Sequence, residues 1–298
     1  MRVWVSGCCG YVGSLLVPYL LCDKHQVVGL DLKWFGGGYL PGDNGSLRLI
    51  SGDMRDEDVL QWSLEDCDVA IHLAGLTSDK SCQIDLELHQ SVNVDALQKV
   101  MRTAKEAGVK QFIYLSSAAI FGGETLYSRA KRECEDIVLY HESRDFPCII
   151  LRPASVCGYA PRMRFDLPVN RMTRDAMMMR EIHVNGGSQV RTNVHIRDLC
   201  DTLRKMVGER KSAILNLCAS NLTMLETAAK VQMLTGARIV THDYTDARSY
   251  EMTSDLPTTY PIEDAIRDMV VRFKSGYWKD AMTNPVYMNV LQEVEAAA

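Results

Sequence analysis

Short apolar runs alternate with longer amphipathic stretches through the first half of the chain. The runs at 2–6, 26–31, 47–50, 68–73, 111–115 and 148–153 have the length of buried strands. The stretches 10–21, 83–107 and 126–141 have helical character, and five glycines with one proline mark 34–46 as a loop. Repeated βα units of this kind predict an α/β protein with a doubly wound parallel sheet and helices on both faces.

The pattern loosens after Pro153, where the later elements become short. We therefore expect a Rossmann-like domain from 1–155, joined by about 188–204, and a smaller C-terminal substrate-binding region from 156–187 and 205–298. Ligands of such sheets bind at the carboxyl ends of the strands, near the point where the strand order reverses. The ends of the strands at 2–6, 26–31, 68–73 and 111–115 should then meet at one site.

Three glycines, Gly7, Gly10 and Gly13, are spaced G-x-x-G-x-x-G between the first predicted strand and the first predicted helix. Glycines there let the backbone approach a diphosphate, and the helix N-terminus supplies free N–H groups. Asp31 ends the second strand, where a carboxylate accepts hydrogen bonds from ribose hydroxyls and repels a 2′-phosphate. The pattern favours NAD over NADP, although Lys33 would tolerate the phosphate. The alternative is a plain glycine-rich turn.

Tyr127 and Lys131 are spaced Y-x-x-x-K at the start of a predicted helix and share one face of it. An ammonium about 6 Å from the ring, at an effective dielectric of about 20, favours the phenolate by about 3 kcal/mol. The phenol could then exchange protons with a sugar hydroxyl near neutral pH. Ser116 and Ser117 end the preceding strand, where a hydroxyl can bind the same oxygen. The alternative is an ordinary Tyr–Lys pair on a helix surface.

Composition and charge exclude several classes of protein. The chain has 298 residues, 47% of them hydrophobic, and a formal charge of −5 without a basic block, so neither nucleic acid nor a membrane surface is expected as a partner. Ten cysteines without a C-x-x-C pair favour a reducing, cytoplasmic location and no metal site. Residues 1–22 resemble a signal peptide only superficially, since glycines interrupt the apolar run. Cys8 and Cys9 are either redox-sensitive at a helix N-terminus or, as we expect, buried filling of a tight turn.

Taken together, these motifs resemble the extended short-chain dehydrogenase/reductases, in particular the NAD-dependent nucleotide-sugar epimerase/dehydratase group. The resemblance extends over nearly the whole chain. The matching stretches are 7–13, 31, 52–54, 72–75, 93–96, 114–122, 127–131, 151–153, 161–167, 191–198 and 246–250.

The resemblance implies a role for each matching residue. Ser117, Tyr127 and Lys131 would form the catalytic group. The residues that would bind NAD are Gly7, Gly10, Tyr11, Val12, Gly13, Asp31, Asp53, Met54, Leu73, Ala74, Gly75, Tyr127, Lys131 and Pro153. The residues that would bind the nucleotide sugar are Thr77, Ser117, Asn170, Arg191 and Arg248. Arg162 and Arg164 either assist there or are solvated loop charges, and Asp53 either meets the adenine or is a solvated loop carboxylate. Family members commonly form homodimers through a helix pair, for which 83–107 and 126–141 are candidates.

Two departures from the family pattern guide the functional hypothesis. Nine residues separate Ser117 from Tyr127, fewer than is usual, which predicts a more open sugar pocket. Ala118 and Ala119 stand where 4,6-dehydratases of the family carry an Asp-Glu pair, so dehydration is disfavoured. We expect C4 epimerisation of a nucleoside diphosphate hexose through a 4-keto intermediate. The alternatives are a 4-dehydrogenase or 4-keto reductase, and a dinucleotide-binding protein without turnover.

Overall fold

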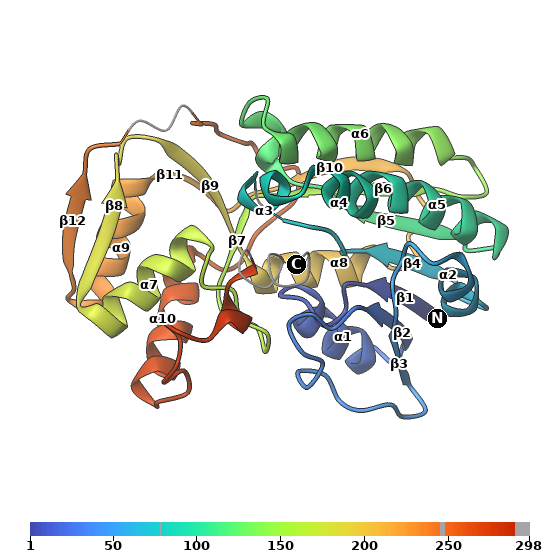
Figure 1. Cartoon of the computed structure of the whole chain (residues 1–298), viewed down its shortest axis with the longest axis horizontal. Helices are drawn as coiled ribbons and strands as arrows, with labels where there is room; N and C mark the ends of the chain where they lie inside the picture. Colours follow the sequence, from blue (N-terminus) through green and yellow to red (C-terminus); the bar gives the residue numbers. More distant parts are fainter. Residues whose placement is uncertain (78, 245–247, 290–298) are drawn as a thin grey trace.

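A seven-stranded, fully parallel sheet forms the larger part of the molecule (Figure 1). The computed structural model describes residues 1–77, 79–244 and 248–289. The strand order is β10-β6-β5-β4-β1-β2-β3, which confirms the doubly wound fold class. The strands are β1 (Arg2–Ser6), β2 (Gln26–Asp31), β3 (Leu47–Ser51), β4 (Val69–His72), β5 (Gln111–Leu115), β6 (Cys148–Pro153) and β10 (Ala213–Leu217).

Helices cover both faces of this sheet because its central strands are apolar on both sides. Val3 and Val5 of β1 belong to the core beneath α1 (Gly13–Cys22) and α8 (Ile196–Met206). Trp4, between them, belongs to the opposite core, which α2 (Glu57–Leu64), α5 (Ala96–Glu106) and α6 (Leu126–His141) cover. Alternate residues of an extended strand point to opposite faces, so one short apolar run supplies both cores.

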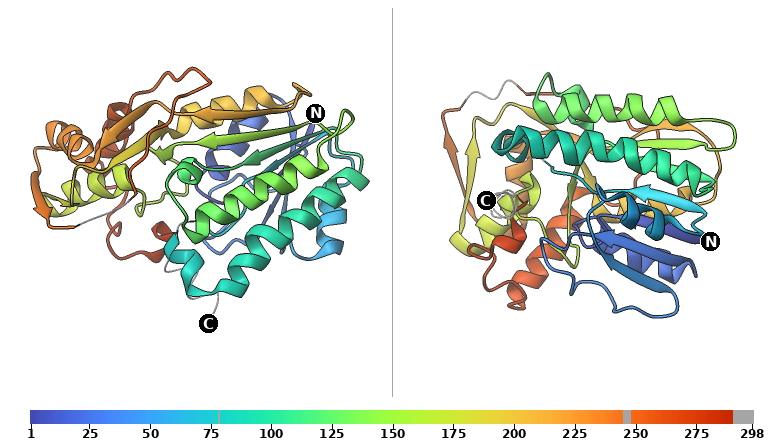
Figure 2. Two further views of the ribbon diagram at one scale, coloured as in Figure 1. Left: turned by 90° about the horizontal axis from the view of Figure 1, so that it is seen from above. Right: turned by 45° about the vertical axis from the view of Figure 1, so that its right-hand side comes forward.

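A smaller lobe stands at one end of the sheet, as Figures 1 and 2 show from three directions. It holds a three-stranded sheet in the order β11-β9-β7, a two-stranded sheet of β12 and β8, and three helices. Its elements are β7 (Ser155–Cys157), α7 (Pro168–Met179), β8 (Glu181–Asn185), β9 (Val190–His195), β11 (Ser220–Thr223), α9 (Met224–Thr235), β12 (Arg238–His242), α10 (Ile262–Lys274) and a 3₁₀ turn at Pro285–Tyr287.

Several details differ from the sequence expectations. The strand β10 lies within 205–298, yet it pairs with β6 as an edge of the large sheet. Within 188–204, β9 joins the small sheet, whereas α8 packs against α1. The first helix begins at Gly13 rather than at residue 10, because the glycine turn occupies the residues before it. The helix α2 was not predicted; Asp56 caps it by accepting the Asp58 N–H.

The helix expected over 83–107 is broken into α3 (Asp79–Ile84), α4 (Leu86–Gln90), a π-helical stretch at Ser91–Asp95, and α5. Asp85 starts α4 afresh by accepting the Leu88 N–H. In the π-helical stretch, the Asn93 amide exchanges two hydrogen bonds with the backbone of Leu76, at 2.7 and 3.0 Å. These hydrogen bonds therefore connect the π-helical stretch to the loop that follows β4.

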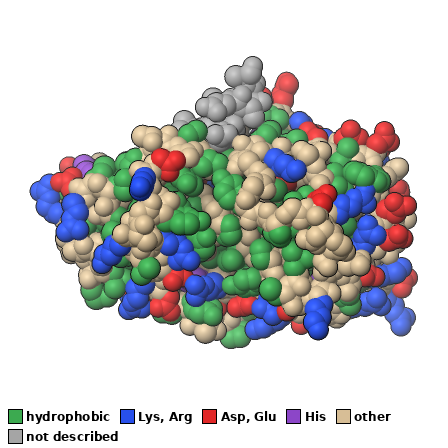
Figure 3. All heavy atoms as spheres, turned by 90° about the horizontal axis from the view of Figure 1, so that it is seen from below, with side chains coloured by type: hydrophobic (Ala, Val, Ile, Leu, Met, Phe, Trp, Pro, Cys, Tyr) green, Lys and Arg blue, Asp and Glu red, His purple; other side chains and the backbone are tan. Residues whose placement is uncertain are grey.

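Two surface observations complete the fold. No helix among the described residues is both long and apolar enough to cross a bilayer. On the face shown in Figure 3, acidic and basic side chains are interspersed, and neither sign forms a continuous patch over the described residues.

Candidate active site

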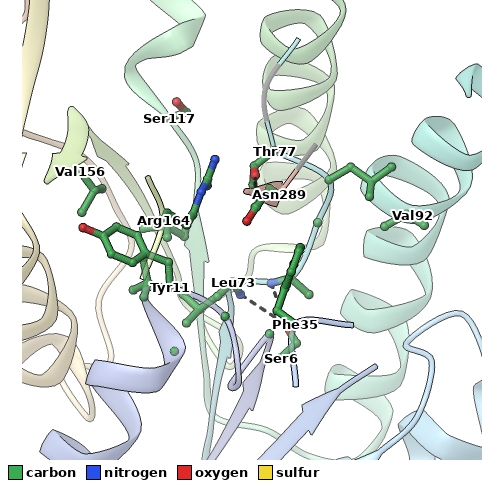
Figure 4. A pocket seen from close by; sticks show the side chains of 18 of the residues that line it. Ser6, Tyr11, Phe35, Leu73, Thr77, Val92, Ser117, Val156, Arg164 and Asn289 are labelled. Carbon is green, nitrogen blue, oxygen red and sulfur yellow. Dashed lines mark hydrogen bonds between the residues drawn. The ribbon is translucent and has the colours of Figure 1, made fainter. Parts of the chain in front are cut away.

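A cavity of about 370 Å³ opens at the carboxyl ends of the large sheet, where it meets the small lobe. The Ser6 hydroxyl accepts the N–H groups of Leu73 and Ala74, both at 3.3 Å, and so fixes the end of β4 against the end of β1 (Figure 4). Most of the residues implicated by sequence line this cavity. They are Gly7, Gly10, Tyr11, Val12, Gly13, Asp31, Asp53, Met54, Leu73, Ala74, Gly75, Thr77, Ser117, Tyr127 and Pro153.

The glycine turn has the close-packed geometry that a diphosphate cradle requires. Gly7 adopts φ +69°, and a Cβ on it would lie 2.9 Å from the Ala74 nitrogen. A Cβ on Gly13 would lie 2.3 Å from the Gly7 oxygen, whereas one on Gly10 would meet that oxygen at 3.2 Å. Gly7 and Gly13 therefore tolerate no side chain. The backbone from Gly10 to Gly13 lines the cavity at the start of α1, so these residues fit a dinucleotide.

Two carboxylates lie at the β2–β3 end of the cavity. Asp31 accepts the N–H of Cys9 at 2.9 Å and that of Lys33 at 2.6 Å, so it also organises the glycine turn. Burial raises the pKa of Asp31 despite these bonds. Burial also acts to raise the pKa of Asp53, but the paired Arg55 guanidinium, 2.6 Å away, brings it below its ordinary value. Asp53 is thus engaged by Arg55 rather than simply solvated.

The two cysteines of the glycine turn are packing residues. Cys8 and Cys9 are 1% and 2% exposed, and their sulfur atoms lie 3.8 Å apart. The hydrogen bond with Cys9 and burial raise the pKa of the Cys8 thiol. A buried thiol held in its protonated form is a poor nucleophile, so the geometry supports the expectation that these residues fill a tight turn.

Tyr127 lies in the first turn of α6, which Thr125 caps, and its ring lines the cavity together with Ser117. Burial raises the pKa of the Tyr127 phenol, whereas the Arg164 charge and the Ser117 hydroxyl act to lower it. Lys131 lies one turn further along, with its Nζ 5.8 Å from the centroid of the Tyr127 ring.

The Lys131 ammonium stands behind the tyrosine rather than in the main cavity. It donates to the Tyr114 hydroxyl at 3.1 Å and to the Leu115 carbonyl at 2.9 Å, and it lines a small pocket on that side. Burial lowers the pKa of Lys131. The Tyr127 phenol therefore has a cation on each side, Lys131 behind it and Arg164 in the cavity.

Arg162 and Arg164 are not solvated loop charges. They are 1% and 9% exposed, and both line the cavity. The Arg162 guanidinium lies 3.8 Å over the centroid of the Phe35 ring, and the Arg162 N–H donates to the Ser14 hydroxyl at the start of α1. Arg164 forms a two-bond ion pair with Asp166. The chain thus brings two buried guanidinium groups from the small lobe to the cavity.

Three residues expected to bind substrate do not line the cavity. Asn170 is fully buried: its oxygen accepts the Gly158 N–H at 2.9 Å, and its amide donates to the Tyr11 hydroxyl. Because those bonds occupy the amide, Asn170 supports the site from behind. Arg191 donates to the Arg248 carbonyl, and Arg248 pairs with Asp79 at 3.0 Å.

Both arginines still belong to the surroundings of the cavity. Tyr250 lines the cavity. Burial raises the pKa of Tyr250, whereas the charges of Arg191 and Arg248 act to lower it. Arg191 and Arg248 therefore lie near the rim of the cavity. Residues 246 and 247, which belong to the matching stretch 246–250, lie outside the described residues.

Phe35 and Asn289 are among the cavity residues that sequence reasoning missed. Phe35 lies in the glycine-rich loop after β2, where the available signal was the presence of aromatic residues, Trp34 and Tyr39 among them, beside the glycines. Asn289 is more than two hundred residues from its partner Thr77, and no local pattern marks it.

Comparisons with known proteins agree with this geometry. The model of the NAD dependent epimerase/dehydratase family matches residues 3–218. The low-salt glycan biosynthesis protein Agl12 of Haloferax volcanii is 27% identical over 256 residues, covering 78% of this chain and 81% of that protein. The UDP-glucose 4-epimerase of Mycolicibacterium smegmatis is 26% identical over 230 residues, covering 70% and 74%.

Among solved structures, MoeE5 in complex with UDP-glucuronic acid and NAD superimposes with a TM-score of 0.81 at 24% identity, covering 93% of this chain and all of that one. At that identity the likeness shows a shared fold. The family match and the NAD-fitting cradle together show that the chain belongs to the NAD dependent epimerase/dehydratase family and is an NAD-dependent enzyme.

Proposed function

We propose that this protein epimerises the C4 centre of a nucleoside diphosphate hexose through a 4-keto intermediate. The observation that carries the proposal is the set of residues that line one cavity. The glycine turn, Ser117 and Tyr127 all line it, and Ser117 is followed there by Ala118 and Ala119. A proton carrier for oxidation at a hydroxyl is present, whereas the acid pair that dehydration would use there is not.

The chain supplies proton transfer and orientation. NAD, when bound, would supply the hydride acceptor and donor for C4. Inversion requires the 4-keto sugar to turn within the pocket, so that the hydride returns to the opposite face of C4. Tyr127 as the phenolate would take the proton from the C4 hydroxyl and later give it back to the reduced oxygen. The Ser117 hydroxyl would donate a hydrogen bond to the same sugar oxygen and hold it in place. The charges of Lys131 and Arg164 would stabilise the phenolate against the burial that opposes it.

The substrate would lie between Tyr127 and the rim of the cavity. Thr77 lines this region, and Arg191 and Arg248 surround Tyr250 beside it. Guanidinium groups suit the oxygens of a diphosphate, so these arginines would hold the nucleotide portion. Arg164, buried inside, would face the sugar side and would favour hexoses that offer acceptor oxygens to a cation.

The test is a panel of UDP-, dTDP- and GDP-hexoses incubated with the protein, with products followed by NMR of the C4 stereocentre. We expect interconversion of one C4 pair without net formation of NADH. Tyr127→Phe should abolish it, whereas Tyr140→Phe on the same helix, where the ring is 86% exposed, should not.

The other outcomes separate the alternatives. Stoichiometric NADH formation or consumption would instead identify a 4-dehydrogenase or 4-keto reductase. A 4-keto-6-deoxy product would identify a dehydratase. Binding of NAD without turnover of any sugar nucleotide would refute the epimerase proposal.

The homodimer implied by family resemblance stays a proposal. On α6, Leu139 and Tyr140 are exposed apolar residues that a helix-pair interface could bury. Light scattering on the pure protein tests it, and Tyr140→Glu should shift a dimer toward monomer.

A further inference from the structure

The segment that follows α10 returns to the active-site cavity. Trp278 is buried against Phe165, with ring centroids 5.2 Å apart, and the Tyr287 carbonyl accepts the Phe165 N–H at 2.9 Å. These contacts fasten residues 275–289 to the small lobe. Figure 1 shows the segment running from α10 back to the boundary between the lobes.

Asn289 ends the described part of this segment and links it to the opposite wall. Its Nδ2 donates to the Thr77 hydroxyl at 2.9 Å, and its side chain projects into the cavity beside Thr77 (Figure 4). The residue is 6% exposed, yet its Oδ1 has no hydrogen-bond partner among the described residues. Leaving a buried acceptor unpaired is unfavourable, so a ligand that offers a donor would be favoured at this position.

The position of Thr77 indicates which part of a ligand meets Asn289. Thr77 follows the end of β4, which lies beside β1 in the sheet. A dinucleotide that extends from Asp31, at the end of β2, to Tyr127, beside β5, must pass over β1 and β4. Its diphosphate would be held at the glycine turn after β1, so the ribose on the nicotinamide side would follow over the end of β4.

We propose that the Asn289 carboxamide oxygen accepts a hydrogen bond from a hydroxyl of the nicotinamide ribose. The inference rests on the NAD-binding part of the proposed function and not on epimerisation. Asn289 is a binding residue in this assignment, and Thr77 positions it.

The experiment uses the full chain after removal of bound NAD, checked by absorbance. Dissociation constants for NAD⁺, ADP-ribose and AMP are measured by calorimetry, and thermal unfolding is followed with and without NAD⁺. Asn289→Leu should raise the constants for NAD⁺ and ADP-ribose between about 2-fold and 13-fold. The constant for AMP, which lacks the second ribose, should stay unchanged.

The stability of the ligand-free protein separates a binding role from a structural one. Asn289→Leu removes an unpaired buried oxygen together with the donor to Thr77. The two losses oppose each other, so the melting temperature without NAD⁺ should change little while the increase caused by NAD⁺ becomes smaller. Asn284→Leu is the matched control on the same segment, because Asn284 caps the 3₁₀ turn and does not line the cavity. It should leave all three dissociation constants unchanged.

Asn289→Asp keeps the acceptor and should bind NAD⁺ within about threefold of the parent protein, since only the donor to Thr77 is lost. A much weaker affinity in Asn289→Asp than in Asn289→Leu would place the residue against the diphosphate and overturn the ribose assignment. Equal loss of AMP affinity would overturn it as well.

The two proposals fail separately. Unchanged NAD⁺ affinity in Asn289→Leu, in a protein that still epimerises, would refute this inference alone. Absence of epimerisation in a parent protein whose NAD⁺ affinity depends on Asn289 would refute the proposed function alone.

Discussion

Replacing Lys131 with methionine tests whether the Lys131 charge lowers the pKa of the Tyr127 phenol enough for proton transfer. The ammonium lies 5.8 Å from the centroid of the Tyr127 ring, and Lys131 is half-buried, so its field is only partly screened by water. Methionine keeps most of the side-chain volume and removes the charge. The hydrogen bonds to Tyr114 and Leu115 are lost with it.

The expected size of the effect follows from the distance. At 5.8 Å and an effective dielectric of about 20, the attraction between the ammonium and a phenolate is about 3 kcal/mol, equivalent to about 2 pH units. The sign is fixed by charge: a cation stabilises the phenolate, so its removal makes the phenol harder to deprotonate. The acidic limb of the pH–rate profile should therefore move to higher pH in Lys131→Met.

The assay is kcat of sugar interconversion at saturating NAD from pH 6 to pH 10.5. Lys131→Met should be slowed about 100-fold at neutral pH, and its rate should go on rising with pH where that of the parent protein levels off. Arg129→Met is the control, because Arg129 is an exposed cation on the same helix and should leave the profile in place.

Two results would refute this reasoning. A uniform loss of rate at every pH would mean that Lys131 acts by holding the cofactor, not by setting the pKa of Tyr127. A limb that moves by less than half a pH unit would assign the main electrostatic role to Arg164, the cation on the cavity side.

Three further predictions concern stability and cofactor binding. His195 caps α8, and burial lowers the pKa of its imidazole to about 4. The free energy of unfolding should therefore fall as pH drops from about 6.5 toward 4, by up to ~1.4 kcal/mol per pH unit. His195→Asn keeps a capping side chain and should flatten this dependence, measured by urea titration at pH 7 and pH 5. Arg152→Met leaves the buried Glu135 carboxylate without its cation and should cost about 3–5 kcal/mol of unfolding free energy, with Arg152→Lys costing less. Gly13→Ala should lower stability by about 1–3 kcal/mol and weaken NAD binding more than Gly10→Ala, by fluorescence titration; equal effects would contradict the Cβ geometry.

The features that could be predicted from the sequence are those that depend on residues close together in the chain. The glycine turn, the Tyr127–Lys131 pair and the strand runs are local patterns, and each is in its expected element. The sequence placed the residues of β10 in the C-terminal region, because nothing in these five residues indicates which sheet they join. Their place in the large sheet depends on the free edge of β6, with which they pair.

The remaining site features depend on contacts between distant parts of the chain. The break at Ser91–Asp95 depends on Asn93 reaching Leu76, and periodicity alone continues the helix. Arg162 could not be separated from a solvated loop charge until Phe35 and Ser14 were placed against it. Asn170 has the residue type of a ligand-binding amide, and only the position of Gly158 shows that its oxygen is engaged.

The hydroxyl of Tyr11 has a consequence for how the two ligands influence one another. It leaves the glycine turn to donate to the Gly158 carbonyl at 2.6 Å and accepts from Asn170 at 3.1 Å, both in the small lobe. If the small lobe moves when the sugar binds, these hydrogen bonds would transmit the movement to the glycine turn that cradles the dinucleotide. Thermodynamic reciprocity then requires that whatever sugar binding does to cofactor affinity, cofactor binding does to sugar affinity by the same factor. Tyr11→Phe, which cuts this link, should make the two affinities more nearly independent.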